Sequence, residues 1–373
     1  MPITIVPYYE ENIPAVVGFN QRLRAGGLPE DYVFSGSHIP PWLPPGGNAP
    51  VYNEFYLALE DGVVRGAYAL KRQDFSFYGN IRPVAYYHHP FSEGLVDRRY
   101  AQVGPQMMMQ AMRAHPLLYL LGMGGYDRPL PRMMMALKWP HSLIPFFFRV
   151  NHPGRFLRKI QALRQSGARR AAAGLAAFSG IGWAGIHAIQ AISGMRGLRA
   201  RADAAVVEEF DDWADEIWER RRSTFAMIAV RDARTLRTLY PASNPNFIRL
   251  KVTRAGREVG WVVAAIARKP DHPQYHDLRV GHILDGLASA EDATLVIAAA
   301  ARALSERDVD VIVSNQSHFA WVQALRDCGF LKGPSNFIFA ASRQLAAMLQ
   351  PFEQAVSFSH WNRGDGDNLL QFI

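Results

Sequence analysis

The feature that most constrains the fold is a repeat within the chain. The stretch "FYLALEDGVVRGAYAL" in the first third of the sequence is similar to "IRLKVTRAGREVGWVV" in the last third. Gly62 and Gly66 of the first stretch have counterparts in Gly256 and Gly260, each 194 residues later. Each stretch alternates apolar and polar residues around a turn with a glycine, which is typical of a β-hairpin. Two copies of one folding unit are therefore predicted.

The same offset extends beyond the hairpins. "LLYLLG", Leu117–Gly122, corresponds to "VIVSNQ", Val311–Gln316, and both are short apolar runs between helical segments. A hairpin followed by helix, strand and helix predicts a mixed α/β (α+β) unit. With 373 residues the chain has room for two such domains. We expect an N-terminal domain over 1–150, a connector over 151–204, a C-terminal domain over 205–348 and a tail over 349–373.

Composition narrows the setting of the protein. Cys328 is the only cysteine, which excludes an intrachain disulfide and a multi-cysteine metal site and fits a reducing compartment. The N-terminus, "MPITIVPYYEENIP", has no basic region followed by an apolar core, so no secretory signal is expected. A cytoplasmic location is therefore predicted.

The connector is rich in positive charge. Of a net charge of +8, much comes from "FRVNHPGRFLRKIQALRQSGARR" and "GMRGLRARAD". Such a connector is suited to anions such as phosphates or lipid headgroups, and a solvated helix face explains the charge equally well. Ala171–Gly194 is rich in small residues, which favours a helix that packs on the domains or lies on a membrane surface over one that spans a bilayer. Peripheral contact with the inner face of a membrane is thus left open.

The order of elements resembles that of the GNAT superfamily of acyltransferases. In the C-terminal copy, "FIRLKV", "VGWVVAAIA" and "DLRVGHILDGLA" are expected as successive strands, and "NFIFAAS" as the final strand. "SAEDATLVIAAAARALSERD" is expected as a helix with Ser289 and Asp292 in a capping box. The resemblance covers most of the chain. It implies two tandem GNAT-like mixed-sheet domains joined by a helical, basic connector.

In that superfamily, a turn of the form Gln/Arg-x-x-Gly-x-Gly/Ala binds the pyrophosphate of coenzyme A at the start of a helix. "DRRYAQVGPQMMMQAM" matches this pattern at Arg99 and Gly104, with Gln102 in place of the first glycine. Unpaired N–H groups and the dipole at a helix start favour an anion. The resemblance therefore implies acetyl-CoA or another acyl-CoA as co-substrate, bound by Arg98, Arg99, Gln102, Val103 and Gly104.

The rest of this stretch, and its counterpart in the second copy, do not favour a ligand. Met107, Met108 and Met112 have helical spacing and are expected in the core. The counterpart, "LASAEDATL", has no glycine or arginine and carries Glu291 and Asp292, which repel a pyrophosphate. Coenzyme A is therefore expected on the N-terminal copy alone.

Acyl transfer to an amine requires a base and a proton donor for the leaving thiolate. The resemblance implies that Glu93 is the base, with His88 beside His89 as a proton relay. Tyr126 is the tyrosine nearest to the expected acid, although Met134 occupies the usual tyrosine position. A purely structural role, as a strand residue or a solvated loop acid, explains each of these residues at least as well.

Polar residues at the ends of strands in the C-terminal copy are candidates for binding the acceptor. These are Asp285, Asn315, His318 and Trp321, and a purely structural role explains them as well. No metal is expected, because His272, His276 and His282 have no cysteine nearby that would support zinc. The tail "SHWNRGDGDN", with Asp365 and Asp367, is expected to fold back over the site.

The leading hypothesis is an acyl-CoA-dependent N-acyltransferase whose N-terminal copy binds the donor and whose C-terminal copy shapes the acceptor pocket. The acceptor is expected to be a small-molecule or lipid-linked amine, such as an amino sugar or a cell-envelope or polysaccharide precursor. One alternative is an aminoacyl-tRNA-dependent Fem-type transferase, which the positive charge suits, although the long helical arm of those enzymes is not evident and nucleic acid is not the expected partner. The other is a non-catalytic tandem GNAT-like binding protein.

Overall fold

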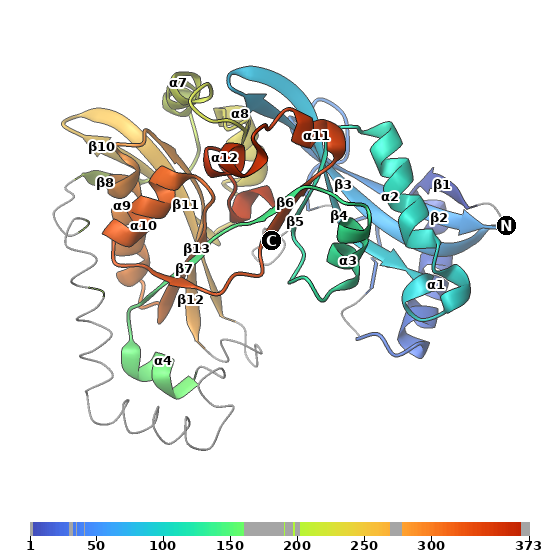
Figure 1. The fold of residues 1–373 in the computed structure, drawn as a ribbon. Coiled ribbons are helices and arrows are strands. Elements are labelled where there is room, and N and C mark those ends of the chain that lie inside the picture. Colours follow the sequence, from blue (N-terminus) through green and yellow to red (C-terminus); the bar gives the residue numbers. More distant parts are fainter. Residues whose placement is uncertain are drawn as a thin grey trace.

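The computed structural model describes residues 3–366 except 30–32, 35, 41, 160–189, 191–196, 198–201 and 269–277. Two mixed β-sheets form the centres of two halves that lie side by side (Figure 1). The strands of the first sheet are β1 (Thr4–Pro7), β2 (Val51–Glu60), β3 (Val63–Phe77), β4 (Asn80–Ser92), β5 (Leu118–Gly122), β6 (His141–Leu143), β9 (Ile228–Ala229) and β15 (Ile338–Ala341). Those of the second are β7 (Phe146–Val150), β8 (Asp203–Val206), β10 (Phe247–Arg254), β11 (Arg257–Arg268), β12 (Arg279–Ala288), β13 (Val311–Asn315) and β14 (Leu331–Gly333).

Helices cover both sheets. They are α1 (Ile13–Ala25), α2 (Val103–Ala114), α3 (Pro129–Ala136), α4 (Pro153–Lys159), α7 (Asp212–Arg221), α8 (Ala233–Leu239), α9 (Ala293–Ser305), α10 (Phe319–Asp327), α11 (Arg343–Ala347) and α12 (Phe352–Ser357). Short 3₁₀ helices are η1 (Glu10–Asn12), η2 (Glu93–Leu95), η3 (Arg98–Tyr100) and η5 (Arg363–Asp365). This arrangement confirms the mixed α/β fold in two similar units.

The repeat is visible in the turns of the two hairpins. Asp61 and Gly62 join β2 to β3 with φ angles of 50° and 76°, and Ala255 and Gly256 join β10 to β11 with 51° and 76°. Two successive residues with positive φ form the turn that matches the right-handed twist of paired strands. Both hairpins also carry an irregularity in register at matching places, after Ala58 and after Val252.

The second glycine of each hairpin allows a helix to pack closely on the sheet. A Cβ at Gly66 would lie 2.9 Å from Val103 Cγ1 in α2, and one at Gly260 would lie 2.7 Å from Val296 Cγ2 in α9. Both distances are shorter than a carbon–carbon contact permits, so any side chain there would push the helix away. The glycines that reveal the repeat therefore have the same packing role in both copies.

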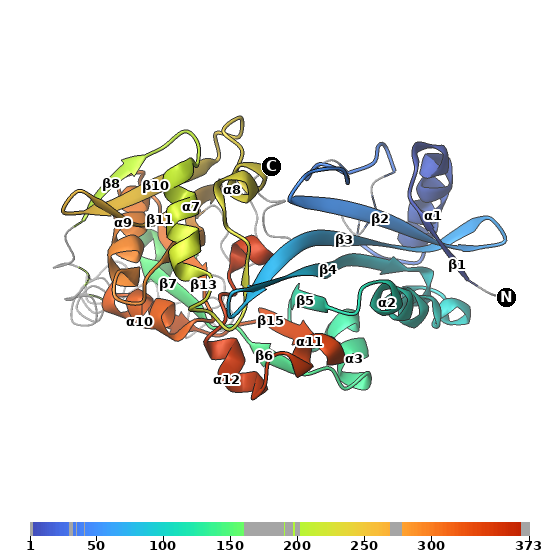
Figure 2. The same cartoon turned by 90° about the horizontal axis from the view of Figure 1, so that it is seen from above.

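The two halves exchange strands: the C-terminal half contributes β9 and β15 to the first sheet, and the N-terminal half contributes β7 to the second. The first sheet has the order β1-β2-β3-β4-β5-β15-β6, with β9 paired to β3, and the second has the order β14-β7-β13-β12-β11-β10-β8. Figure 2 shows β15, from the C-terminal part of the chain, between β5 and β6, with which it pairs antiparallel. In return, β7 from the N-terminal part lies between β13 and β14.

The exchange corrects the expectation that "NFIFAAS" is the last strand of the C-terminal sheet. Its apolar residues suit either sheet, because alternation sets which face of a strand is buried but not which strands are its neighbours. In the first sheet Phe339 stacks on Trp361, with ring centroids 4.2 Å apart. The boundaries at 150, 204 and 348 remain predictions. A strand that precedes the connector, β7, belongs to the second sheet, and a strand that follows it, β15, belongs to the first.

Much of the connector lies outside the described residues, including most of Ala171–Gly194. Of that stretch the structure describes Gln190, which is buried and bonds through its side-chain amide to both the N–H and the C=O of Val150. Within the described parts of the chain, no helix combines the length and the apolar character needed to cross a bilayer.

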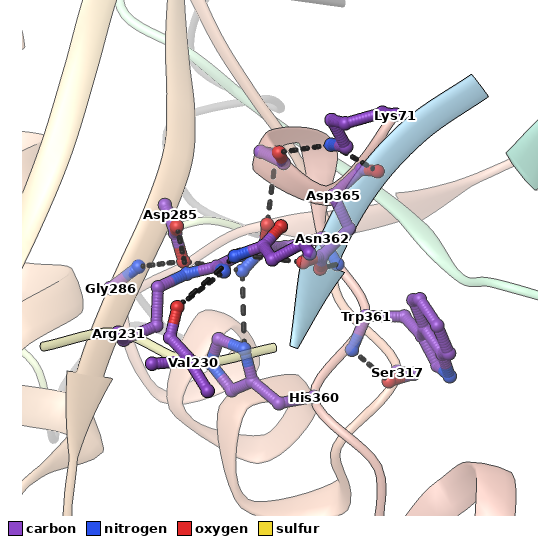
Figure 3. A network of polar contacts seen from close by, with 12 residues as sticks. Lys71, Val230, Arg231, Asp285, Gly286, Ser317, His360, Trp361, Asn362 and Asp365 are labelled. Carbon is purple, nitrogen blue, oxygen red and sulfur yellow. Dashed lines mark hydrogen bonds and ion pairs between the residues drawn. The ribbon is translucent and has the colours of Figure 1, made fainter. Parts of the chain in front are cut away.

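A buried ion triad joins the halves near the centre of the molecule (Figure 3). Arg231 donates to Asp285 Oδ2 at 2.6 Å and to Asp365 Oδ1 at 2.5 Å, and all three side chains are at most 1% exposed. Burial opposes a charged guanidinium, but the two carboxylates outweigh it and raise the pKa of Arg231 above its ordinary value. The triad is therefore a set of charges that stabilise one another away from water.

The triad fixes the C-terminal segment, residues 359–366, between the two sheets. Asn362 donates to Asp285 Oδ1 at 2.8 Å, and the backbone C=O of Asp365 accepts from Lys71 Nζ at 2.8 Å and from Tyr119 Oη at 2.9 Å. Lys71 and Tyr119 belong to β3 and β5 of the first sheet, whereas Asp285 belongs to β12 of the second. The segment thus bonds to both halves at once.

The triad gives a prediction for stability. Arg231→Met leaves two buried carboxylates without their cation and should lower the free energy of unfolding by about 3–5 kcal/mol. Denaturant unfolding followed by tryptophan fluorescence measures the change. The control is Arg220→Ala, whose side chain is 46% exposed and pairs with Glu216 at 3.4 Å, and which should cost below about 1 kcal/mol. Equal stability of Arg231→Met and the wild type would contradict the role of the triad.

Candidate functional site

Two neighbouring parallel strands of the first sheet diverge after a short pairing. β4 and β5 pair only at Ala85 with Leu118 and at Tyr86 with Tyr119. Beyond these positions β4 continues through six more residues to Ser92 without β5 beside it. Such a divergence opens the sheet at the carboxyl ends of its strands, where ligands commonly bind. His88 is the second residue of β4 past the last pair.

His88 is buried, and one of its ring nitrogens is not engaged. The side chain is 2% exposed, stacks on Tyr86 at 4.9 Å and meets the edge of Trp42 at 5.7 Å. Its Nδ1 lies 3.2 Å from Nδ1 of His89, while its Nε2 has no hydrogen-bond partner among the described residues. A buried polar atom without a partner is costly, so such atoms are often found where a ligand binds.

The local backbone places His88 and His89 next to a bulge. In the pairing of β3 with β4, Ala67 faces Phe91 and Ala69 faces His88, so β4 has an extra residue between them. His89 has a φ of 47°, a conformation that side-chain-bearing residues seldom adopt. Bulges of this kind re-aim strand residues and are common beside active sites.

The surroundings of His88 keep its imidazole neutral. Burial, and then the repulsion from His89 and Lys71, lower the pKa of His88 well below its ordinary value of 6.5. At neutral pH the ring therefore has a lone pair on one nitrogen. If Nδ1–H donates to His89, that lone pair is on the unengaged Nε2.

The donor turn predicted from the sequence opens α2, as expected. Gln102 is the N-cap of α2 and is exposed, and Val103 is buried at 2% exposure. The first N–H groups of a helix have no intrahelical acceptor. A Cβ at Gly104 would meet only Ser92 Cβ, at 4.0 Å. Side chains of the described residues therefore leave the space at Gly104 open, and backbone can be approached closely there.

The two arginines before the turn are at the surface. Arg98 and Arg99 are exposed, and Arg99 pairs with Asp97 at 2.6 Å with 80% of its side chain exposed. The hydrogen bonds from Arg99 lower the pKa of Asp97. Met107 and Met108 are fully buried and Met112 is partly buried, which confirms that these three methionines face the core, whereas Met109 between them is 43% exposed.

Glu93, the predicted base, is bonded to two arginines. It is 5% exposed, and its two carboxylate oxygens bond to Arg22 at 2.8 Å and to Arg65 at 3.0 Å. The Arg65 guanidinium also lies 4.1 Å from the ring centroid of Tyr100. The carboxylate thus ties α1, β3 and η2 together, and its oxygens are already occupied.

Tyr126, the predicted acid, lies in the loop after β5. Its ring is 41% exposed and meets His141 of β6 at 5.6 Å. No contact of Tyr126 with His88 or Glu93 is found among the described residues. Met134, at the usual tyrosine position, is fully buried in the core beneath α2.

In the C-terminal half the corresponding place is filled by the chain itself. β12 and β13 pair in parallel up to Ile283 with Ser314, so Asp285 stands two residues past the last pair, as His88 does in β4. Asp285 is fully buried and bonds to Arg231, Asn362 and Tyr240, the last at 2.8 Å. The segment 359–366 therefore occupies the divergence of the second sheet.

Of the other predicted acceptor residues, Trp321 and His318 lie beside the same segment, whereas Asn315 bonds elsewhere. Asn315 donates to Pro145 O at 3.4 Å, and Trp321, 1% exposed, meets the ring of His360 at 5.5 Å. His318 is the N-cap of α10, and burial and then His360 lower its pKa to about 3. The structure thus groups Asp285, Trp321 and His318 around a protein segment.

The start of α9, the corresponding helix of this half, is occupied by its own acidic side chain, which disfavours an anion. Ser289 donates to Asp292 Oδ2 at 2.9 Å and accepts from the N–H of Asp292 at 3.1 Å, and Asp292 pairs with Arg254 at 2.9 Å. α9 begins after these residues, at Ala293, rather than at the predicted capping box. His272, His276 and Asp367 lie outside the described residues. Within the part of the chain that the structure describes, no group of three or more His, Cys, Asp or Glu side chains is placed to bind a metal.

Sequence reasoning missed a polar band on the inner face of the first sheet, the face toward the C-terminal half. The band consists of Asn53, Lys71, Gln73 and His88 on β2, β3 and β4, all at most 4% exposed. Cross-strand pairing of Asn53 with Lys71 and of Ala69 with His88 puts them on one face. The available signal was polar residues at inward positions where the two-residue alternation requires apolar ones.

The band separates two hydrophobic clusters. On one side α1 packs Val16, Phe19 and Leu23 against the sheet, and on the other Trp361 packs on Phe75 and Tyr119. Figure 2 shows α1 and α2 on opposite sides of the first sheet, so the band and α2 lie on different faces. A donor bound at α2 has to pass through the divergence of β4 and β5 to reach His88.

Comparison with known proteins gives matches at the level of structure. No protein-family model and no curated protein matches the sequence. Saccharomyces cerevisiae N-myristoyltransferase with bound myristoyl-CoA is similar over 92% of this chain and 79% of that chain, with a TM-score of 0.54 and 12% identity. A GCN5-related N-acetyltransferase from Anabaena variabilis ATCC 29413 is similar over 91% of this chain and 72% of that one, with a TM-score of 0.50 and 11% identity.

Likeness at this identity shows the fold and not the activity. The two diverging parallel pairs, the repeated hairpins and these similarities agree with one another. The chain therefore has a tandem GNAT-like fold.

Proposed function

We propose that the protein is an acyl-CoA-dependent N-acyltransferase with its reaction site in the N-terminal half. The observation that carries this proposal is the difference between the two divergences. In the second sheet, Asp285 is bonded to Arg231, Tyr240 and Asn362, and the chain's own segment occupies the divergence. In the first, His88 Nε2 has no partner among the described residues, and the space at Gly104 is open.

The donor would bind with its diphosphate at the start of α2 and its thioester in the divergence of β4 and β5. Val103 and Gly104 offer backbone N–H groups at the positive end of the helix dipole. Arg98, Arg99 and Gln102 are exposed beside them and can bond to phosphate oxygens. The solved structure of N-myristoyltransferase holds myristoyl-CoA, which supports acetyl-CoA or a longer acyl-CoA as the donor.

The chemistry follows from a neutral His88. The amine nitrogen attacks the thioester carbonyl, a C–N bond forms and His88 Nε2 takes a proton from the nitrogen. The C–S bond then breaks, and the imidazolium returns the proton to the leaving thiolate, which departs as the thiol of coenzyme A. The low pKa of His88 makes it a weak base, so it takes the proton once C–N bond formation has made the nitrogen acidic. The same low pKa makes the imidazolium a strong acid, which favours return of the proton to the thiolate. We favour His88 over Glu93 as the base because both Glu93 oxygens are bonded to arginines.

The acceptor would be a small-molecule or lipid-linked amine, with an amino sugar or a cell-envelope precursor as the preferred class. The basic residues before and within the connector support a reaction at an anionic membrane surface. We place the protein in the cytoplasm, with peripheral contact to the membrane through the connector.

Donor binding is tested at Gly104. Gly104→Asp puts a carboxylate where the diphosphate would bind, and the dipole tolerates it at a helix start. Affinity for acyl-CoA, measured by calorimetry with acetyl-CoA and longer chains, should fall at least about tenfold. Gly104→Ala is the matched control, because the space accepts a Cβ, and its affinity should stay close to that of the wild type. Equal affinities of Gly104→Asp and wild type would place the donor elsewhere.

The base is tested at His88. His88→Gln keeps a polar side chain of similar reach but cannot accept the proton, so kcat should fall by about 10²–10⁴. The KM for acyl-CoA should change little, because His88 is on the inner face and the diphosphate site is on α2. His152→Gln, a surface histidine paired with Asp308 at 2.8 Å, is the control and should retain full activity. A kcat for His88→Gln within threefold of wild type would return Glu93 to consideration.

A further inference from the structure

The polar band contains a buried asparagine whose side chain bonds to nothing in the described structure. Asn53 is 2% exposed, and neither its Nδ2 nor its Oδ1 has a hydrogen-bond partner among the described residues. Buried amides are otherwise satisfied, since each unmade bond costs free energy. The unsatisfied amide of Asn53 therefore lowers the stability of the fold.

A second buried asparagine shows the usual arrangement. Asn20 on α1 is 7% exposed, and its Nδ2 donates to Phe34 O at 2.5 Å while its Oδ1 accepts from Phe34 N at 3.1 Å. Both ends of that amide are used to fix a loop. Asn53 has the same side chain and similar burial but no such loop, so burial by itself does not explain its presence.

The position of Asn53 connects it to the reaction site. Asn53 pairs with Lys71, and Ala69, two residues before Lys71, pairs with His88. Two strand spacings and two residues along the strand separate the Cα atoms of Asn53 and His88 by about 12 Å. Both side chains are on the inner face, so one small molecule of about the length of a disaccharide can contact both.

The chemistry of the band selects the kind of group that binds. The unengaged atoms are the donor and acceptor of Asn53, Oε1 of Gln73 and Nε2 of His88. Hydroxyl groups both donate and accept, so several on one rigid ring can satisfy such a mixed set. The aromatic ring of Trp42 beside His88 suits the C–H surface of a sugar ring.

We propose that Asn53 is a specificity-determining residue, which hydrogen-bonds a hydroxyl of an amino-sugar acceptor whose amine lies at His88. This inference rests on the proposed function and adds to it the residue that reads the acceptor. Asn53 contacts the part of the acceptor away from the reacting amine. It therefore governs KM for the acceptor, not the chemical step.

The test replaces Asn53 by leucine, which has a similar shape and no polar atoms. Three amines of comparable length serve as acceptors: fully deacetylated chitobiose, Gly-Gly-Gly-amide, and octylamine, which has no second polar group. Asn53→Leu should raise KM for chitobiose about tenfold or more with little change in kcat. KM for octylamine and for acyl-CoA should not change.

Stability provides an independent readout of the same variant. Removal of an unsatisfied amide should raise the Tm of Asn53→Leu by about 2–4 °C. Asn20→Leu is the matched control, which loses two formed hydrogen bonds and should lower Tm. A variant that is more stable yet binds the acceptor less well is the signature of a binding residue, and a structural residue would lose stability instead.

Each outcome decides the proposal. Unchanged KM for all three amines would overturn it and reduce Asn53 to a site for a bound water, while the acyltransferase function would stand. A loss confined to Gly-Gly-Gly-amide would overturn the sugar class in favour of a peptide acceptor. If the wild type transfers no acyl group, calorimetry with chitobiose still decides, because binding that Asn53→Leu weakens supports the inference and no binding by the wild type overturns it.

Discussion

The structure depends on three charges buried together at its centre. Arg231 bonds to Asp285 and Asp365 with almost no exposure to water, and Asp365 belongs to the C-terminal segment that runs between the sheets. Because a buried charge has to be paired, Asp365 and the segment that carries it are held beside Arg231 once the charges are buried. The exchange of β7 and β15 acts in the same direction, since each sheet is completed only by a strand from the other half. The two copies are therefore joined through their sheets as well as through the triad.

The same triad decides what occupies the divergence of the second sheet. Both sheets diverge after a parallel pair, and both have a polar residue two positions later, His88 in one and Asp285 in the other. Asp285 is taken up by Arg231, Tyr240 and Asn362, so the second divergence holds the chain together. The two copies thus differ: in one, the divergence holds a segment of the chain, and in the other the buried polar band has atoms without a hydrogen-bond partner among the described residues.

Parts of the candidate site follow from sequence and parts do not. The turn at Gly104, the core methionines and the place of His88 on a strand were predicted from local patterns, which depend on residues a few positions apart. The partners of Glu93 are Arg22 and Arg65, 71 and 28 residues away, and no local pattern relates them. Asn53, Lys71 and Gln73 were missed because they stand in polar stretches of β2 and β3, such as "KRQD", in which alternation does not show which face is buried. Only the sheet shows that they are neighbours on the inner face.

The sequence by itself determined the repeated unit. Gly62 and Gly256 set the same turn, and Gly66 and Gly260 make room for the same helix, because backbone conformation and close packing depend on residues near in the chain. Only the tertiary structure decided which sheet β7 and β15 join and what fills the second divergence. Strand exchange and buried ion pairs are contacts between distant residues, and many strands of similar alternation can make them. The chain thus specifies its parts locally, and the packing of the two halves assigns each part its role.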